Sequence, residues 1–365
     1  MVATVALVLG LTGAPGAVAG PAAPVTRCTL SDPRLDEASG LAVTPSGPAV
    51  VDDSGNATVV YTLAPDCSVA STRAVGVTGR DVEDLARGAD GTLWLADIGD
   101  NGRARATIAL IRLPVRGTGD VRRLVYPDGP HDAETLLLPA DGQPVIVTKD
   151  LGGRSGIYTT AAPPTGPGPT PLRHAGELVA PQSSTDGGPV GSFGRGLFTG
   201  GALSADGRVA AVRTYADAWL YRVPDGSGSA DAVVAALRGT PVGVPLPGEP
   251  QGEAIAFTAD GTLLSTGEAG TSPQGGKGTA SLRAVPGAAQ LAASSGAAAG
   301  PVSSGDGSSA APPEGASASG ADRGPGAGLV LGATAGVVVL AGALLWGLRA
   351  RLVGGGRRGG ARGRR

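Results

Sequence analysis

The sequence predicts an all-β fold, a β-propeller with five blades. The first observation is a unit that occurs five times, in which an apolar run, an Asp-Gly or Ser-Gly turn and a second strand-like run follow one another. Such turns between short strands are typical of β-hairpins. The second observation is the spacing of the turn glycines, 44, 51, 65 and 54 residues, which is close to the length of a four-stranded blade. The turn glycines are Gly47, Gly91, Gly142, Gly207 and Gly261.

The first 23 residues have the pattern of a secretory signal peptide. An apolar run from Val2 to Leu11 leads to Ala17-Val18-Ala19, which resembles an A-x-A cleavage site. The usual basic segment is missing, because no Lys or Arg precedes Arg27. A start codon further upstream or an atypical signal would explain this, and a disordered Ala/Gly leader is the alternative.

The propeller is expected to occupy residues 24–285, with its ring closed by the N-terminal strand Val25–Leu30. The fifth repeat shows only three strands of its own, at 254–258, 262–266 and 279–285. A strand from the other terminus would complete that blade and remove an open edge. Cys28 would then lie on the closing strand and Cys67 in the neighbouring first blade. In an exported protein such a pair is expected to form a disulfide.

The other blades follow from the same pattern. The first is predicted over 41–77, the second over 85–126, and the third over 135–179 with a Pro/Gly-rich loop before its outer strand. The fourth is predicted from strands at 208–213, 218–223 and 232–237. The 65-residue spacing leaves room for a sixth blade, but its strands would have to form in Gly/Ser/Pro-rich sequence.

The C-terminal 80 residues predict a membrane anchor. Residues 286–327 are rich in Gly, Ala, Ser and Pro and are expected to be a disordered, flexible spacer. Residues 328–348 carry no charge and are long enough for one transmembrane helix, with Trp346 near its end. The Arg-rich tail 349–365 predicts a cytoplasmic C-terminus with the propeller outside.

Charge argues against nucleic acid as a partner. Seven of the 29 basic residues lie in the tail, which leaves 22 basic against 31 acidic side chains in residues 1–348. The folded part is therefore acidic, and topology alone accounts for the basic tail.

Alignment of the repeats on the turn glycine places acidic residues in two columns, ten and eight residues before the glycine. Because these positions lead into the first strand of each blade, the carboxylates are expected to ring one mouth of the axial channel. Calcium takes six to eight oxygen ligands, so the ring could hold this ion, with Glu83, Glu134 and Glu253 as its metal ligands. The acidic members are Glu37, Asp81, Glu83, Asp132, Glu134 and Glu253.

Three further candidates stand six or seven residues after the turn glycine: Asp97, Lys149 and Arg213. The two cations are the candidates for binding an anionic group. The alternative for the whole acidic set is structural, since carboxylates before a strand can cap turns and accept backbone N–H bonds.

Motifs for nucleophilic catalysis are missing from the sequence. It contains no G-x-S-x-G elbow, no HExxH and no P-loop, and its one G-x-G-x-x-G match lies in the Arg-rich tail. Only two histidines occur. His131 stands among acidic residues and could be a general acid at the channel mouth, although a surface histidine is the alternative, and His174 is expected on an outer strand.

Residues 27–285 resemble a group of exported actinobacterial β-propeller proteins of unassigned function, related at fold level to WD-repeat and esterase-like phytase propellers. The acidic columns also resemble those of calcium-dependent propellers of the phytase and lactonase kind. No phytase residue set can be carried over, because the basic phosphate-binding cluster is not visible. The resemblance rests on DEASGLA from Asp36, DVEDLA from Asp81, ADIGDN from Ala96, YPDGPHDAE from Tyr126, RTYADAWLY from Arg213 and QGEAIAFTADG from Gln251.

Two functional hypotheses follow. The first is a membrane-anchored, extracytoplasmic propeller that acts as a binding or scaffolding module for a polar ligand or a protein partner. The alternative is a calcium-assisted hydrolase of phosphate esters or lactones, for which the acidic mouth is the evidence.

Overall fold

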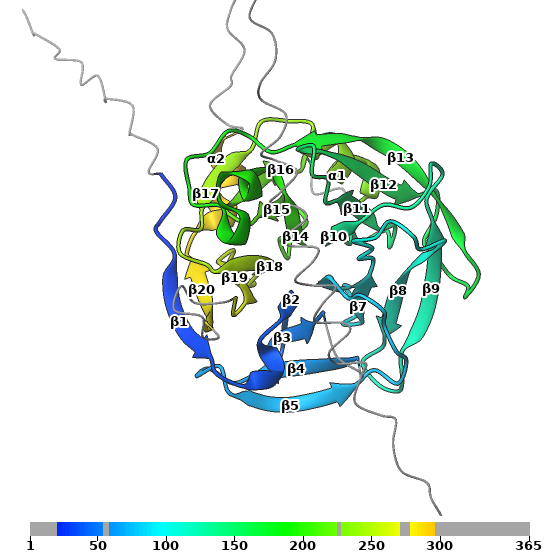
Figure 1. Ribbon diagram of the computed structural model, residues 1–365, viewed down its shortest axis with the longest axis horizontal. Coiled ribbons are helices and arrows are strands. Elements are labelled where there is room, and N and C mark those ends of the chain that lie inside the picture. The colour runs from blue at the N-terminus through cyan, green and yellow to red at the C-terminus, as the bar shows by residue number, and fades with distance from the viewer. Residues whose placement is uncertain (1–19, 54–57, 225–227, 271–277, 296–365) are drawn as a thin grey trace, which may run out of the picture. The chain divides into compact units, whose positions relative to one another are not determined.

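The computed structural model describes residues 20–53, 58–224, 228–270 and 278–295. These residues form a propeller-like ring of antiparallel β-sheets around a central axis (Figure 1). The first strand of each four-stranded unit lies next to the axis and packs against the first strands of its neighbours. The prediction of an all-β, propeller-like fold is therefore confirmed.

Three units are separate four-stranded sheets. The first contains β2 (Ala38–Thr44), β3 (Gly47–Asp52), β4 (Val59–Leu63) and β5 (Val69–Ala74), preceded by the 3-10 helix η1 (Pro33–Leu35). The second contains β14 (Phe198–Leu203), β15 (Val209–Thr214), β16 (Asp217–Arg222) and β17 (Val242–Pro245), preceded by η2 (Gly188–Gly196). The third contains β18 (Gln251–Phe257), β19 (Leu263–Glu268), β20 (Ala280–Val285) and β1 (Val25–Leu30).

The remaining eight strands form one sheet made of two four-stranded units. Their outer strands, β13 and β9, pair in parallel through only two positions, Thr170 with Leu124 and Pro171 with Val125. The first unit contains β6 (Asp84–Arg87), β7 (Leu93–Asp97), β8 (Ile108–Leu113) and β9 (Asp120–Val125). The second contains β10 (Ala133–Leu137), β11 (Val145–Thr148), β12 (Arg154–Thr160) and β13 (Thr170–Val179).

The turn between the first two strands of each unit explains why the repeat is visible in the sequence. Gly91 has φ +83°, a left-handed conformation that a side chain would strain, and the other four turn glycines also have positive φ. Asp90 accepts a hydrogen bond from the Thr92 backbone N–H at 3.0 Å and so closes its own turn. The Asp-Gly pair is therefore required by the backbone of the hairpin.

The N-terminal strand closes the ring as predicted. β1 pairs antiparallel with β20, from Val25 opposite Ala284 to Leu30 opposite Ala280. The predicted disulfide is also confirmed: Cys28 on β1 is bonded to Cys67, with a Cα–Cα distance of 5.7 Å. Cys67 lies in the turn between β4 and β5, so the disulfide links two adjacent units of the ring.

Apolar side chains fill the spaces between neighbouring sheets. One cluster joins the first two units of the chain through Val51, Leu85, Leu95 and Ile111, all of them 0–2 % exposed. Strand residues alternate between the two faces of a sheet, so each sheet contributes to the core on both sides.

One predicted strand is wrong. Residues 232–237 belong to the helix α1 (Ala230–Leu237), and the outer strand of that unit is β17. The Ser229 side chain caps the helix by accepting from the Ala232 backbone N–H, and the Ala-rich sequence favours helix. Val233 and Leu237 share one buried face of this helix.

The folded region also continues beyond its predicted end at residue 285. Helix α2 (Ala288–Ser295) occupies the start of the predicted spacer, with Ala288 and Ala292 buried in the core. The rest of the predicted spacer, the predicted transmembrane helix 328–348, the tail 349–365 and residues 1–19 of the predicted signal peptide lie outside the described residues. Within the described ranges, no helix is long and apolar enough to cross a membrane.

The disulfide is expected to stabilise the ring without being required for folding. Cys28→Ser with Cys67→Ser should lower the free energy of unfolding by ~3–4 kcal/mol, because the unfolded chain loses a constraint on a loop of about 40 residues. Urea denaturation of the variant and of the oxidised protein measures the difference. A variant with unchanged stability, or two free thiols in a non-reduced digest of the natural chain, would contradict the assignment.

Candidate functional site

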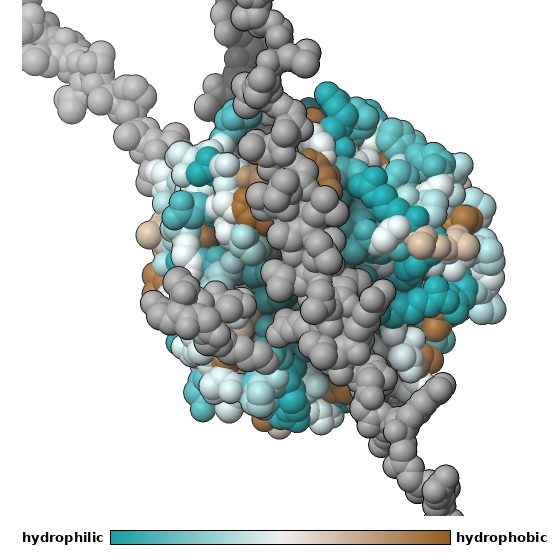
Figure 2. Space-filling view, viewed as in Figure 1, coloured by the Kyte–Doolittle hydropathy of each residue, from teal (hydrophilic) through white to brown (hydrophobic). Residues whose placement is uncertain are grey.

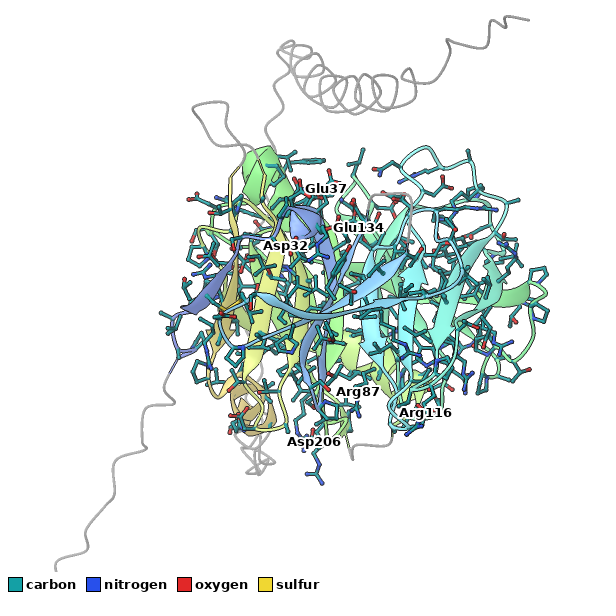
Figure 3. All side chains as sticks on the ribbon, turned by 90° about the horizontal axis from the view of Figure 1, so that it is seen from below. Asp32, Glu37, Arg87, Arg116, Glu134 and Asp206 are labelled. Carbon is teal, nitrogen blue, oxygen red and sulfur yellow. A yellow bond between two sulfur atoms is a disulfide. The ribbon has the colours of Figure 1, made fainter. Side chains whose placement is uncertain are left out.

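The upper end of the axis, defined here as the end that carries Glu37 and Glu134 in Figure 3, is lined by buried carboxyl groups. Glu83, Glu134 and Glu253 stand at equivalent places on three units and are only 3–4 % exposed. The other two units contribute hydroxyls at this level: Ser39 donates to Glu83 Oε2 at 3.2 Å, and Thr199 donates to the Gly252 carbonyl at 3.0 Å. The column eight residues before the turn glycine therefore converges on the axis.

Lys149 is the cation at the centre of this group. Its ammonium donates to Glu134 Oε1 and, at 2.8 Å, to the Tyr215 hydroxyl. It also lies 5.0 Å from the centre of the Tyr215 ring, a cation–π distance. Negative charge on Glu134, Glu253 and Glu83 raises the pKa of Lys149 well above its ordinary value against the opposing effect of burial. Lys149 is therefore charged at neutral pH.

One ammonium does not balance the surrounding acids. Burial raises the pKa of Glu134 to about 8, and the pKa values of Glu83 and Glu253 rise well above the ordinary value for the same reason. The pKa values of Asp53 and Glu268 are also raised, to about 9 and about 8, first by burial and then by neighbouring negative charge. Several of these groups therefore hold protons at neutral pH.

Protons are shared between carboxyls within the cluster. A side-chain hydrogen bond joins Asp81 to Glu83, and another joins Glu253 to Glu268. Some oxygens still have no hydrogen-bond partner among the described residues: Asp53 Oδ1, Glu134 Oε2 and Glu253 Oε2. Buried acceptors without partners are costly to leave unsatisfied, so these oxygens favour a ligand with positive charge or donor hydrogens.

The fit to a metal ion is mixed. Buried carboxylate oxygens are the donors that calcium takes, and three of them are unpartnered. However, within the described part of the chain no three acidic, His or Cys side chains are grouped closely enough to hold a metal ion. The predicted metal ligands are gathered at one mouth, but their side chains would have to move to share one ion.

A polar pocket of about 280 Å³ opens beside Lys149. Asp132 and Lys149 form part of its wall, and Arg103 forms an ion pair with Asp150 at 2.6 Å across it. Asp132 is 7 % exposed, and its Oδ1 accepts from the Asp100 backbone N–H at 2.8 Å. Burial raises its pKa. The lining residues are Asn101, Arg103, Asp132, Lys149, Asp150, Leu151 and Gly152.

Other predicted site residues have structural roles. Arg213 was a candidate for binding an anion, but its side chain is fully buried and bonded to Glu249 at 2.8 Å and to Ser265 at 2.8 Å. That prediction does not fit, because a ligand cannot reach this guanidinium. The expectation that it faces the mouth came from its column alone, which cannot show the direction of a side chain.

Asp97 likewise holds the local backbone. Its Oδ1 accepts from the backbone N–H groups of Arg80 and Asp81 and from the guanidinium of Arg105. Glu37 lies at the upper end in Figure 3, and its backbone N–H donates to Asp52 Oδ1 at 3.0 Å. The structural alternative for acidic residues near the turns therefore holds for Asp97.

Sequence reasoning missed Asp84, the residue after Glu83. Its Oδ2 accepts from the backbone N–H groups of Leu136 at 2.8 Å and Gly201 at 3.1 Å, which belong to β10 and β14. This fully buried carboxyl joins three units across the axis. The signal was available, because the other repeats have small or hydroxyl residues at the same position.

Tyr215 was also missed, since it follows β15 in only one repeat and no column contained it. His131, by contrast, does not reach the cluster around Lys149. Its Nε2 lies 3.0 Å from Asp128 Oδ1 and 3.0 Å from the Tyr158 hydroxyl. The alternative of a surface histidine fits these contacts better than a general acid at the axis.

Known proteins give fold likeness only. No protein-family model and no curated protein matches the chain. Similar solved structures include a gluconolactonase from Xanthomonas campestris, with 14 % identity and TM-score 0.39 over 75 % of this chain and 98 % of that chain. The PQQ-bound aldose sugar dehydrogenase from Streptomyces coelicolor has 12 % identity and TM-score 0.36 over 73 % of this chain and 100 % of that one.

A catalytically inactive virginiamycin B lyase from Staphylococcus aureus is also similar, with 13 % identity and TM-score 0.33 over 66 % of this chain and 80 % of that one. These neighbours are β-propeller-like proteins. Identities of 12–14 % with TM-scores below 0.5 give no basis for transferring an activity.

The raised pKa values predict that stability falls as pH rises. The native carboxyls hold protons that the unfolded chain has lost, so their contribution is complete below about pH 4.5 and disappears as pH passes the native values of about 8 for Glu268 and about 9 for Asp53. The melting temperature should therefore decrease from pH 5 to pH 9. Glu268→Gln should flatten that decrease, whereas Glu177→Gln on the exposed edge of β13 should not. A melting temperature that increases over this range would contradict the proton-sharing arrangement.

Proposed function

We propose that this chain is a hydrolase that acts on lactones or phosphate esters in the polar pocket beside Lys149. The observation that carries the proposal is the presence of an acidic and a basic side chain, Asp132 and Lys149, in the wall of the same pocket. Perturbed ionisable groups at an open pocket are the usual constituents of an active site. Glu134 and Tyr215 hold the ammonium in place.

The chemistry assigned to these residues is attack by water on an acyl or phosphoryl centre. Asp132 accepts a proton from the water molecule while the water oxygen bonds to the acyl carbon. Lys149 donates a hydrogen bond to the carbonyl oxygen, where negative charge develops. The ester C–O bond then breaks, and the proton passes from Asp132 to the leaving alkoxide. For a phosphate ester, the same groups act on the P–O bond.

Calcium remains part of the proposal because of the oxygens that lack partners. Glu83, Glu134 and Glu253 would hold it, next to Lys149, which bonds to Glu134. When bound, a divalent cation supplies Lewis-acid polarisation of a carbonyl or phosphoryl oxygen. The chain's own contribution is to gather these carboxylates at one end of the ring and to offset their repulsion with Lys149.

The second candidate is a binding or scaffolding module without catalysis. The observation that favours it is the limited access to Lys149, whose side chain is only 13 % exposed and already has two hydrogen-bond acceptors. In that case the pocket binds a polar ligand or a side chain of a protein partner, and the carboxyls stabilise the ring.

The cellular setting is proposed on sequence grounds. Residues 1–23 direct export, 328–348 anchor the chain in the cell membrane, and the tail remains in the cytoplasm, so that the ring is extracytoplasmic. The membrane is then a partner through the helix, and nucleic acid is not a ligand of the acidic ring. We further propose that the five four-stranded units are the complete set of blades.

Activity assays separate the two candidates. The purified chain should hydrolyse γ-lactones or 4-nitrophenyl phosphate, and Asp132→Asn should lower kcat by about 10²–10⁴-fold because the proton acceptor is lost. Lys149→Met should lower kcat by a similar factor, on the order of 10²–10³. Glu177→Gln, at an exposed carboxylate that is not part of the pocket lining, is the matched control. If the folded chain cleaves neither substrate class, the binding module is the better account.

Calcium binding is tested by thermal melting. At free calcium 100 times the dissociation constant, linkage predicts stabilisation of ~2.7 kcal/mol. Glu134→Gln should weaken this effect, whereas Glu314→Gln in the predicted spacer should leave it unchanged. A flat calcium titration of the natural chain would show that the carboxyls serve only as hydrogen-bonding groups, each worth ~1–2 kcal/mol on substitution.

A further inference from the structure

A second cavity, of about 350 Å³, lies at the lower end of the axis, the end that carries Arg87, Arg116 and Asp206 in Figure 3. It differs from the upper mouth in chemistry. All five units contribute to its walls, which are mostly aliphatic, with one aromatic ring. The main wall residues are Leu41, Leu85, Leu136, Leu203 and Phe257.

The cavity stays open because small residues occur at one level of the ring. In four units, the residue five positions before the turn glycine is an alanine that lines the cavity: Ala42, Ala86, Ala202 and Ala256. Larger side chains at this level would fill the axis, since inner strands of adjacent units are in contact. The volume is within the range of small-molecule sites.

Asp84 ties together two of the strands that line the cavity. Its carboxyl accepts the backbone N–H groups of Leu136 and Gly201, and both of these residues line the cavity. The buried carboxyl thus fixes the backbone of two wall strands relative to β6. The lower cavity is a separate site from the pocket beside Lys149, with which it shares no lining residue.

Among the described residues that line the cavity, Arg87 is the one with a charge. It is an exposed residue at the end of β6, where it pairs with Leu93 of β7. Among the described residues, its guanidinium has no hydrogen-bond or ion-pair partner. The nearby turn aspartates have local partners: Asp90 accepts from Thr92, Asp206 from Ser204, and Asp260 from Thr262. Arg87 is therefore the group available to a ligand at this rim.

We propose that the lower axial cavity binds an amphiphilic carboxylate, with its hydrocarbon chain between the inner strands and its carboxylate on Arg87. The apolar walls gain from excluding water from the chain. The guanidinium of Arg87 matches the planar geometry of a carboxylate and can donate two parallel hydrogen bonds to it. This site does not depend on the hydrolase proposal, because it lies at the opposite end of the ring.

The test is isothermal titration calorimetry of the purified full chain with octanoate, octanol and octylamine. Octanoate should bind more tightly than octanol, and octylamine should bind most weakly. Arg87→Gln should weaken octanoate binding at least ~10-fold while leaving octanol binding unchanged. Arg116→Gln, an exposed arginine on the same lower face, is the matched control and should have no effect.

Ala256→Leu is the second variant and should abolish binding of all three probes by filling the cavity. Circular dichroism and melting establish that each variant is folded, and Arg87→Gln provides the test if Ala256→Leu is not. No octanoate binding by the natural chain, tighter binding of octylamine than of octanoate, or an Arg87→Gln variant with unchanged octanoate affinity would each overturn the proposal. Hydrolytic activity should be the same in Arg87→Gln as in the natural chain. A failure of the carboxylate-binding proposal can therefore be distinguished from a failure of the hydrolase proposal.

Discussion

The ammonium of Lys149 offsets carboxylates that the ring brings together at its upper end. The first strands of the five units pack around one axis, and Glu83, Glu134 and Glu253 stand on or directly before three of them. Repulsion among buried carboxylates at ε values typical of protein interiors amounts to several kcal/mol per pair, so charge must be neutralised. The structure does this with Lys149, with protons shared between carboxyl pairs, and with hydroxyl donors such as Ser39. Such a cluster lowers the free energy of unfolding. A cluster that lowers stability is expected where the side chains have a function.

The two ends of the axis have opposite chemistry because of a short run of residues. Glu83 faces the acidic mouth, Asp84 bonds to two neighbouring strands, and Leu85 lines the lower cavity. The face shown in Figure 2 is mostly hydrophilic, with scattered hydrophobic residues. The proposed hydrolysis therefore lies at the acidic end of the ring, and the proposed binding of an amphiphilic carboxylate lies at the other end.

The periodicity of the sequence predicted much of this arrangement. The turn glycines located five hairpins, the missing fourth strand of the last unit located the closing strand, and the position of Cys28 and Cys67 followed from that closure. The acidic columns located the mouth because equivalent positions of equivalent units must lie at the same level. Sequence periodicity therefore predicts the positions that every repeat has in common.

Features of single repeats could not be predicted in the same way. Helix α1 replaced a predicted strand because Ser229 caps a helix in one unit only. Arg213 shares a column with Asp97, yet its side chain turns into the core toward Glu249, a direction that depends on tertiary packing. Lys149 was found as a candidate, but its contact with Tyr215 joins residues 66 apart in the chain and has no sequence signal.

The proposed hydrolysis requires that a ligand reach Lys149 and Asp132 through the polar pocket. A crystal structure of the chain with 4-hydroxybutyrate, the product of γ-butyrolactone hydrolysis, tests it most directly. We expect the carboxylate of the product to accept a hydrogen bond from Lys149 and its hydroxyl to lie within hydrogen-bonding distance of Asp132. Lys149 enclosed by Glu134 and Tyr215 with the product absent from the pocket, or bound only elsewhere on the ring, would contradict it.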